Sequence, residues 1–324
     1  MKNSIYAEVT DKIIADLEKG DLTWLKPWNA GNTAGRITRP LRYNGLGYGG
    51  INVLMLWAAA IEAGYSSACW MTFKQARELG AHVRKGETGS MVVYAGTISR
   101  EGDEDENEDK DKEEGEGVKQ IPFLKTYTVF NVEQIEGLPE HYHEKPAPVI
   151  DPVERIAHVD QFFAATRAEI RHGGNRAYYS GSSDHVQMPC FESFRSGDAY
   201  CATLAHEMIH WTKHESRLDR DFGAKKRGDE AYAFEELVAE LGAAFLCADL
   251  ALTPEPGADH AAYIQSWLKV LKEDKRALFS AAAHAQRAVE FLQGLQSLAG
   301  TGEPPRKRRI SFLGKNARPP TADT

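Results

Sequence analysis

The amino-acid sequence predicts an α+β fold with two domains, a small mixed α/β domain followed by a mainly helical domain with a small sheet. Three observations support this prediction. The 324 residues correspond to about two domains at roughly 150 residues each, and 42% apolar residues can supply a core for both. Runs typical of strands are few and short, whereas several longer segments have helical periodicity. A Pro-rich change in composition over residues 141–150 divides the chain.

Composition and charge suggest the domain boundaries. We expect a first domain at residues 1–140, a linker at 141–150, a second domain at 151–300 and a disordered basic tail at 301–324. Residues 101–117 hold eleven Asp or Glu against two Lys, a local charge of −9 within a net charge of −8. Because such dense like charge cannot bury apolar area, we interpret 101–120 as a solvated acidic loop at the tip of a hairpin.

The first half is expected to contain helices over residues 4–18, 51–63 and 72–79 and strands over 90–98 and 127–132. Ile5, Val9 and Ile13 recur four residues apart, which places them on one stripe of the first helix. Thr72 and Gln75 match the pattern of a capping box at the start of the third helix.

The second half is expected to contain a helix from Asp151, a hairpin over 178–189 and helices over 198–213, 229–250 and 258–298, the last broken near Asp274. An N-cap followed by a first-turn proline starts the first of these helices, to which Val159, Phe163 and Ile170 are assigned. The strand over 185–188 is either the edge on which an extended peptide pairs or part of a plain structural hairpin.

Several classes of protein are excluded by simple features of the sequence. No apolar run approaches the ~18 residues of a membrane span, and the first twenty residues carry seven charges instead of a secretory signal. We therefore expect a cytoplasmic protein with no membrane partner. The four cysteines are far apart and form no C-x-x-C pair, so we interpret them as reduced thiols.

The strongest chemical signal is the H-E-x-x-H motif that runs from His206 to His210. Residues four apart lie on one face of a helix, so the two imidazoles can occupy neighbouring corners of a zinc tetrahedron. Glu207 would point at the open corner. The motif therefore predicts one Zn²⁺ per chain, with His206 and His210 as ligands and Glu207 as general base.

A third zinc ligand is expected downstream of the motif. Lys213 and Ser216 stand where a metzincin has its Gly and third His, which excludes that subclass. The apolar helix over 234–245 instead carries Glu236 and Glu240 one turn apart, and buried carboxylates need a cation or donors. We assign Glu236 as the ligand and Glu240 as the acceptor of a ligand histidine's second ring proton, with Glu235 as the rival ligand.

This arrangement resembles the gluzincin metallopeptidases, in which a glutamate on a second helix completes the zinc site. The usual supporting acid of that family is an aspartate, whereas this chain has Glu240. A zinc-activated water would attack a carbonyl, and Glu207 would take the water's proton and deliver it to the leaving amine. His214, Arg217 and Tyr232 are unranked candidates for stabilising the oxyanion.

A weaker signal lies in the first half, where aromatic and basic residues alternate between residues 24 and 94. Single-stranded nucleic acids bind to grooves that combine cations for the backbone with rings for the bases. Our candidates for contact with single-stranded DNA are Trp24, Trp28, Arg36, Arg39, Arg42, Tyr43, Lys74, Arg84 and Lys85. The glycines from Gly45 to Gly50 are either a flexible turn or a phosphate site at a helix start.

The whole arrangement is similar to the ArdC-type antirestriction proteins of conjugative plasmids and related mobile elements. The resemblance is carried by Trp24 to Trp28, Arg42 to Gly45, Gly49 to Asn52, Trp70 to Ala76, Val83 to Glu87, Tyr127 to Val132, His206 to Thr212, Arg217-Leu218 and Glu235 to Glu240. It implies a single-stranded-DNA-binding domain joined to a zincin-like metallopeptidase domain, and a role in protecting incoming plasmid DNA from host restriction. The acidic run and the basic tail are outside the resemblance.

Two further functional classes stay open from the sequence. One is a single-stranded-DNA-binding replication or transfer accessory protein whose zinc site is structural or inactive. The other is a protease directed at a host protein, with no meaningful contact with DNA. The sequence does not name a protein substrate, for which a host restriction component is one candidate.

Overall fold

The computed structural model describes residues 5–19, 38–100, 119–143, 152–222, 228–252 and 260–299. The helices are α1 (Ile5–Glu18), α2 (Ile51–Ala63), α3 (Phe73–Glu78), α4 (Pro152–Ala165), α5 (Gly197–Trp211), α6 (Gly228–Asp249), α7 (His260–Glu273) and α8 (Ala277–Ala299). The strands are β1 (Leu41–Arg42), β2 (Cys69–Met71), β3 (His82–Val83), β4 (Ser90–Arg100), β5 (Lys119–Asn131), β6 (Ile135–Glu136), β7 (Glu169–His172), β8 (Tyr178–Ser180) and β9 (His185–Met188). This content confirms the predicted α+β class.

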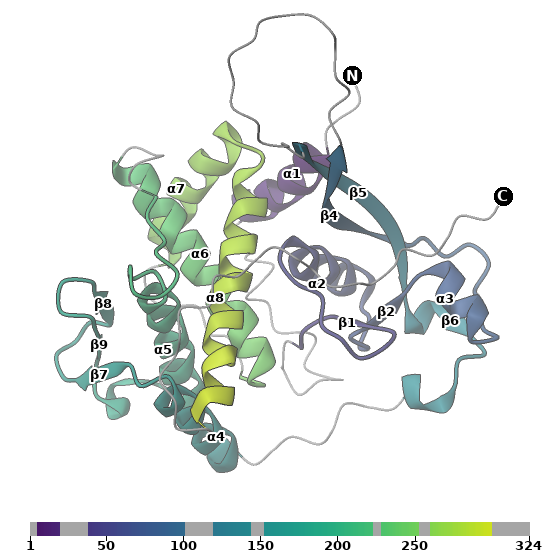
Figure 1. Cartoon of the computed structure of the whole chain (residues 1–324). Helices are drawn as coiled ribbons and strands as arrows, with labels where there is room; N and C mark the ends of the chain where they lie inside the picture. The colour runs from purple at the N-terminus through teal and green to yellow at the C-terminus, as the bar shows by residue number, and fades with distance from the viewer. Residues whose placement is uncertain are drawn as a thin grey trace, which may run out of the picture.

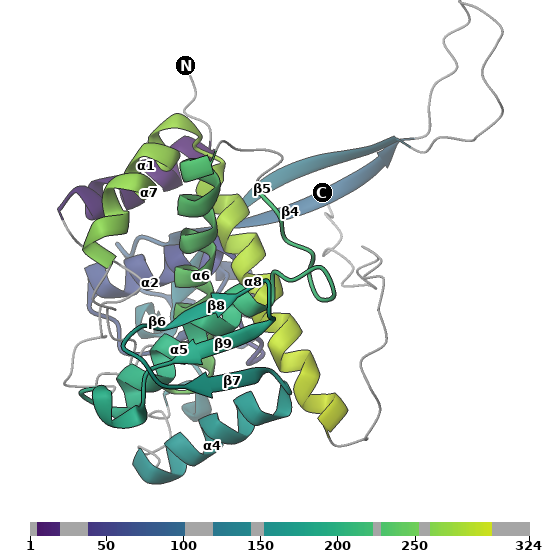
Figure 2. The same ribbon diagram turned by 90° about the vertical axis from the view of Figure 1, so that its left-hand side faces the viewer.

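The largest sheet of the first half has the strand order β1-β2-β5-β4. β1 is parallel to β2, and the other pairs are antiparallel. β4 and β5 pair along the whole of β4, from Ser90 opposite Val129 to Arg100 opposite Lys119, and Figure 2 shows them extending away from the helices as a two-stranded arm. The short strands β3 and β6 form a separate antiparallel pair beside α3.

The sheet of the second half has the order β7-β9-β8, with β7 parallel and β8 antiparallel to β9. It lies beside α5 (Figures 1 and 2). The interpretation of residues 185–188 as a sheet edge is therefore wrong, because β9 is the central strand and its hydrogen-bonding groups are occupied on both sides. β7 and β8 are the edges.

One hydrophobic core connects the two halves of the chain. α1 packs on α7. In addition, the ring of Tyr6 on α1 contacts the ring of Phe279 on α8, with the ring centroids 4.7 Å apart. Trp57 of α2, which is fully buried, packs edge-on against Phe245 of α6. A second, smaller core lies under α3, β3 and β6 and contains Met71, Ala76, Ala81, Val132, Ile135 and Leu138. The helices α6, α7 and α8 of the second half are therefore packed directly against the first half.

Most predicted elements are confirmed within a few residues, including the Thr72–Gln75 capping box and the break between α7 and α8. Two assignments are wrong. α4 ends at Ala165, and Ile170 lies in β7 because Arg167 adopts a left-handed conformation with φ 58° that ends the helix. β5 begins at Lys119, inside the predicted acidic loop, because Lys119 and Gln120 continue the ladder opposite Arg100 and Ser99.

Some predictions fall outside the described residues. These are the acidic run 101–117, the basic tail 301–324, most of the linker, and the candidates Trp24, Trp28 and Arg36. Among the residues that the structure describes, no helix is long and apolar enough to cross a membrane. The four cysteines are free thiols, as predicted, and Cys201 and Cys247 are buried.

Candidate metal centre

The helix α5 presents the H-E-x-x-H motif at its C-terminal end. Its first turn is capped by Ser196, whose hydroxyl accepts a hydrogen bond from the backbone N–H of Ala199 at 3.0 Å. The motif begins two turns later, so His206 and His210 lie one above the other on a single face. Glu207 and His210 are buried, and His206 is half-buried.

A close contact between α5 and α6 brings the glutamates to the histidines. Gly242 of α6 faces Ile209 of α5, and a Cβ atom at Gly242 would lie 2.9 Å from two carbon atoms of that side chain. The absence of a side chain at this position therefore allows the two helix backbones to approach. In consequence the glutamates that precede Gly242 in α6 reach the motif.

Three ligand atoms converge at the face shared by these helices. Nε2 of His206 and Nε2 of His210 are 3.2 Å apart. The first lies 3.4 Å from Oε2 of Glu236, and the second lies 3.4 Å from Oε1 of the same carboxylate. Ligand atoms at about 2.0–2.2 Å from a tetrahedral zinc ion would be about 3.3–3.6 Å from one another. These distances fit a small divalent ion with three protein ligands.

Two further carboxylates fix the orientation of the imidazole rings. Nδ1 of His210 is 3.1 Å from Oε1 of Glu235, and Nδ1 of His206 is 3.7 Å from Oε2 of Glu240. A carboxylate at Nδ1 favours the tautomer whose proton is on Nδ1 and whose lone pair is on Nε2. When the rings are neutral, both lone pairs face Glu236, and a cation between the three groups would balance their negative charge.

Arg220 stabilises this network and was not singled out by the sequence. Its guanidinium, 2% exposed, donates to both carboxylate oxygens of Glu235 at 2.8 and 2.9 Å, and also to Thr212 and to the carbonyl of Ile209. Glu235, the rival ligand in the sequence analysis, is therefore held between Arg220 and His210. Only the tertiary contact identifies Arg220, since it lies outside the helices in a segment with no recognisable motif.

The charges of the cluster shift the pKa values of its members in a consistent way. Burial alone would lower the pKa of His206, but hydrogen bonds with Glu236 and Glu240 and the charge of Glu207 raise it to about 10. The pKa of His210 is also raised, because Glu235 and Glu236 outweigh its burial. Conversely, Arg220 and His210 overcome burial and lower the pKa of Glu235 to about 2. The carboxylates of the cluster thus favour a positive charge at the two imidazoles, which a bound metal ion would also provide.

The three candidates for an oxyanion donor occupy different settings. The Arg217 guanidinium, 8% exposed, pairs with Asp184 and lies over the ring of Trp211. His214 contacts the hydroxyl of Ser216 at 2.8 Å. Tyr232 lies one turn before Glu236 on α6, is 56% exposed, and contacts the hydroxyl of Tyr263 on α7 at 3.0 Å.

Arg39, a candidate for DNA contact, lies at the junction of the two halves. Its side chain is 11% exposed and pairs with Asp249 of α6 through two hydrogen bonds of 2.5 and 2.8 Å. It also donates to Gln286 of α8 at 3.0 Å. Its charge is therefore neutralised within the protein.

The other described candidates occupy three separate elements of the first half. Arg42 and Tyr43 lie at the end of β1. The guanidinium of Arg42 lies over the ring of Tyr48, and Tyr43 is 39% exposed. Lys74 is exposed on α3, 4.0 Å from Glu78. In the loop between β3 and β4, Arg84 pairs with Glu87, and Lys85 is exposed.

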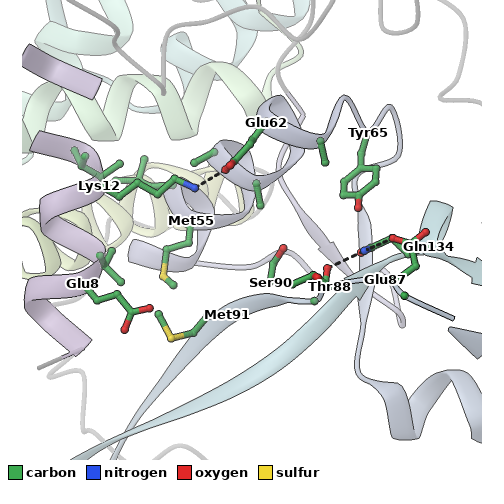
Figure 3. A pocket seen from close by; sticks show the side chains of 18 residues that line it. Glu8, Lys12, Met55, Glu62, Tyr65, Glu87, Thr88, Ser90, Met91 and Gln134 are labelled. Atoms are coloured by element: carbon green, nitrogen blue, oxygen red, sulfur yellow. Dashed lines mark hydrogen bonds and ion pairs between the residues drawn. The ribbon is translucent and has the colours of Figure 1, made fainter. Parts of the chain in front are cut away.

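A pocket of about 600 Å³ lies between α1, α2 and the start of β4, away from the metal ligands (Figure 3). Met55 and Met91 form part of its apolar wall, and Lys12 pairs with Glu62 across it at 2.6 Å. Its lining holds Glu8, Glu62 and Glu87 against one lysine. This excess of negative charge disfavours phosphate-bearing ligands in the pocket.

Two family models match separate parts of the chain. Residues 3–130 match the family model of the N-terminal domain of anti-restriction factor ArdC, and residues 157–284 match that of a zincin-like metallopeptidase. An uncharacterised protein, y4eC, of Sinorhizobium fredii (strain NBRC 101917 / NGR234) is 42% identical over 92% of this chain and 94% of its own length. DNA primase TraC of Escherichia coli is 39% identical over 90% of this chain, which spans only 27% of that primase.

Two solved structures are also similar over nearly the whole chain. Both are of the antirestriction protein ArdC from plasmid R388. The metal-free form is 49% identical, with a TM-score of 0.75 over 91% of this chain and 98% of that one. The Mn(II)-bound form is 48% identical, with a TM-score of 0.72 over 90% of this chain and 98% of that one.

Proposed function

This chain belongs to the ArdC family of antirestriction proteins and contains the zincin-like metallopeptidase domain. We propose that it binds single-stranded DNA and that it hydrolyses peptide bonds with a metal ion held by His206, His210 and Glu236. The observation that carries the peptidase proposal is the convergence of two imidazoles and one carboxylate, with N–N and N–O distances of 3.2–3.4 Å and with Glu207 on the helix of the two histidines. A structural zinc site normally has four protein ligands, whereas three are found here among the residues that the structure describes.

The donor set fits a zinc ion. Two imidazole nitrogens and one carboxylate oxygen are the ligands of many catalytic zinc sites, and the spacing between them suits tetrahedral coordination. A Mn(II)-bound form is known for the R388 relative, so a divalent ion is the expected class and zinc is our specific proposal. When bound, zinc would lower the pKa of a water molecule and polarise a carbonyl group.

The residues of the chain divide the remaining chemistry among them. Glu207 accepts a proton from the attacking water and transfers it to the nitrogen of the leaving amine, for which a buried carboxylate within the motif is suited. Glu235 and Glu240 hold the imidazoles in one tautomer, and Arg220 keeps Glu235 in place.

Tyr232 is the best placed of the three candidates to stabilise the oxyanion. Burial, the hydrogen bond to Tyr263 and the nearby charge of Glu236 raise the pKa of its hydroxyl, which therefore keeps its proton and can donate it. Arg217 and His214 have other partners within the protein. A hydroxyl next to a metal ligand can reach the negative charge that develops on the substrate.

The proposal of DNA binding is supported by the family and by the primase relative, together with exposed basic and aromatic side chains in the first half. Cations neutralise the phosphates, and aromatic rings stack on unpaired bases. The protein substrate of the peptidase domain is unknown, and a host restriction component is one candidate.

The metal centre is tested by metal analysis of the purified full chain, first stripped with a chelator and then titrated with zinc and with manganese. We expect one zinc ion per chain, retention of the metal in Glu207→Gln, and loss of it in Glu236→Ala. Glu230→Ala, on the same helix but one and a half turns earlier, is the matched control. Full metal binding by Glu236→Ala would remove Glu236 as a ligand.

Peptidase activity is tested on unfolded protein substrates and on candidate restriction subunits, with and without single-stranded DNA. Glu207→Gln should lose all turnover, whereas Glu215→Gln, an exposed residue after α5, should keep it. If the zinc-loaded wild-type protein cleaves nothing, the accessory-protein hypothesis with an inactive site is favoured. Turnover by Glu207→Gln would remove Glu207 as the base.

DNA binding is tested by titration of a 15-nucleotide oligo-dT at several salt concentrations. A protein that contacts several phosphates loses affinity steeply as salt rises. Absence of binding at low salt would contradict the DNA-binding half of the proposal and favour a protease without DNA contact.

A further inference from the structure

The arm formed by β4 and β5 carries a row of aromatic side chains on one face. Tyr94 is opposite Lys125 in the ladder, and Gly96 is opposite Phe123, so all four residues share a face. Tyr127 lies two residues further along β5 and points to the same side. We name Tyr94, Phe123, Lys125 and Tyr127 the arm face.

The side chains of the arm face are exposed, or half-buried at Phe123, and arranged against one another. Tyr94 is 55% and Tyr127 41% exposed, and the rings of Tyr94 and Phe123 have centroids 6.1 Å apart. The ammonium of Lys125 lies 5.1 Å from the centroid of the Tyr127 ring. Gly96 makes room for this packing, because a Cβ there would lie 2.8 Å from the Phe123 ring and 3.0 Å from the Tyr94 ring.

The outer part of the arm has no protein partner among the described residues that would explain so many exposed rings. β2 pairs with β5 only at Phe130 and Asn131, so the arm is two-stranded beyond that point. At its base, the amide of Asn52 on α2 exchanges two hydrogen bonds of 2.8 Å with the backbone of Val93. The arm is thus anchored at its base, and its two strands extend away from the helices (Figure 2).

The charge of the arm identifies the class of ligand. Among the residues of the two strands whose side chains the structure describes, Lys125 is the only charged one. A surface that combines a cation with exposed rings and has no carboxylate is suited to an unpaired polynucleotide, whose phosphates are anionic and whose bases have free faces. An apolar protein partner would not require the positive charge.

The spacing of the rings also matches such a ligand. Phe123, Lys125 and Tyr127 are every second residue of β5, so neighbouring side chains of this row are about 6.8 Å apart, twice the rise per residue of an antiparallel strand. Successive nucleotides of an extended strand can therefore meet successive side chains. Phe123 lies four residues, about 14 Å, from the start of β5, where the acidic run joins it, and this exceeds the ~8 Å screening length at physiological ionic strength.

We propose that the arm face is a stacking surface for consecutive bases of single-stranded DNA, with Lys125 placed to contact the phosphate between them. The proposal rests on the DNA binding proposed above and names a site for it. The rings supply sequence-tolerant stacking, and the lysine supplies the part of the affinity that depends on salt.

The test measures the affinity of the full chain for fluorescein-labelled dT15 and for an abasic 15-mer of the same charge. Tyr94→Ala, Phe123→Ala and Tyr127→Ala are each expected to weaken binding of dT15 by about fivefold or more. None of them should change binding of the abasic strand. Tyr94→Phe keeps the ring and should bind as wild type, whereas Tyr94→Leu keeps an apolar strand residue but should bind as Tyr94→Ala.

Lys125→Met separates the electrostatic part of the proposal from the stacking part. It should reduce the slope of log affinity against log salt by about 0.7, the value for one phosphate of a single strand. Tyr178→Ala and Lys213→Met are matched controls, because Tyr178 is exposed on β8 and Lys213 lies over the Tyr179 ring, both in the second half. Both controls should bind dT15 as wild type.

The outcomes distinguish this proposal from the proposed function. If the three ring variants bind dT15 with wild-type affinity, the arm face is not the binding site, although DNA binding itself stands. If the ring variants lose as much affinity for the abasic strand as for dT15, the rings do not act by stacking on bases. Absence of dT15 binding by the wild type removes DNA binding itself. If the wild type is a dimer that Tyr94→Ala dissociates without a change in dT15 affinity, the arm face is a contact between copies of the chain.

Discussion

The metal cluster and the arm face place their reactive side chains in opposite environments. At the cluster, His210, Glu235, Glu236 and Glu240 are all buried, and each imidazole is bracketed by carboxylates. On the arm, Tyr94 and Tyr127 are largely exposed. The difference shows which physical term controls each site, because uncompensated charge is costly in a buried cluster, whereas stacking and screened charge dominate on an exposed strand.

This contrast also explains why mutations should act differently at the two sites. A buried carboxylate that loses its partner leaves an unpaired charge, and neighbouring residues respond together. Removal of an exposed ring leaves no buried charge unpaired, so its effect should be limited to that ring and the neighbour that it contacts, as Tyr94 contacts Phe123.

The largest effect that we expect, and one that only the buried metal site should show, is the pH dependence of metal binding. The neighbouring carboxylates raise the pKa of His206 to about 10, so in the metal-free protein this ring is protonated at pH 7 and must lose its proton to bind zinc. Zinc affinity should therefore rise about tenfold per pH unit for each proton displaced between pH 6 and 8. Competition with a chromophoric chelator of known pH behaviour measures it, and a pH-independent affinity would contradict the charge balance described for the cluster.

A smaller effect on metal affinity is expected from Glu235→Gln. This substitution keeps an oxygen near His210 but removes the charge that fixes the tautomer and pairs with Arg220. We expect zinc affinity to fall by about 10–100-fold, the usual cost of losing such a supporting carboxylate. Glu230→Gln on the same helix is the control, and equal affinities for both variants would show that Glu235 does not act on the metal.

Substitution of Gly242 tests the close helix contact that assembles the buried site. In Gly242→Ala the new methyl would press on Ile209, and we expect the free energy of unfolding to fall by about 1–3 kcal/mol. Gly294→Ala on α8 is the matched control, because a Cβ at that position would have no neighbour within 4 Å among the described residues, and it should gain up to about 1 kcal/mol in helix propensity. Urea unfolding of both variants measures the difference, and equal midpoints would argue against close packing of α5 on α6.

The smallest effect is expected from Arg39→Met on DNA binding. Because Arg39 is held by Asp249 and Gln286, its removal should change dT15 affinity by less than about twofold. Arg42→Met, whose guanidinium is exposed at the end of β1, is the comparison at a position open to DNA. A large loss of affinity in folded Arg39→Met would show that Arg39 contacts DNA despite its internal partners.

Local sequence patterns predict some elements of this chain better than others. The elements α1, α2, α5 and α6 were predicted nearly to their ends, because helical periodicity and capping are local properties. The convergence of Glu236 with the motif histidines was proposed from burial of charge in an apolar helix, and the structure places these groups 3.4 Å apart. The full length of β5 was missed, because the acidic run obscured the start of its alternating pattern.

The sequence by itself therefore predicted the class of the fold, the placement of His206, Glu207 and His210 in one motif, and the burial of Glu236 in an apolar helix. Spacing within one helix and an apolar pattern are readable from one chain. Only the tertiary structure decided that Glu235 orients His210 under the control of Arg220, that Arg39 joins the two halves, and that rings from two strands form one face. Each of these depends on which elements become neighbours, and neighbours distant in sequence are chosen by packing of the shared core.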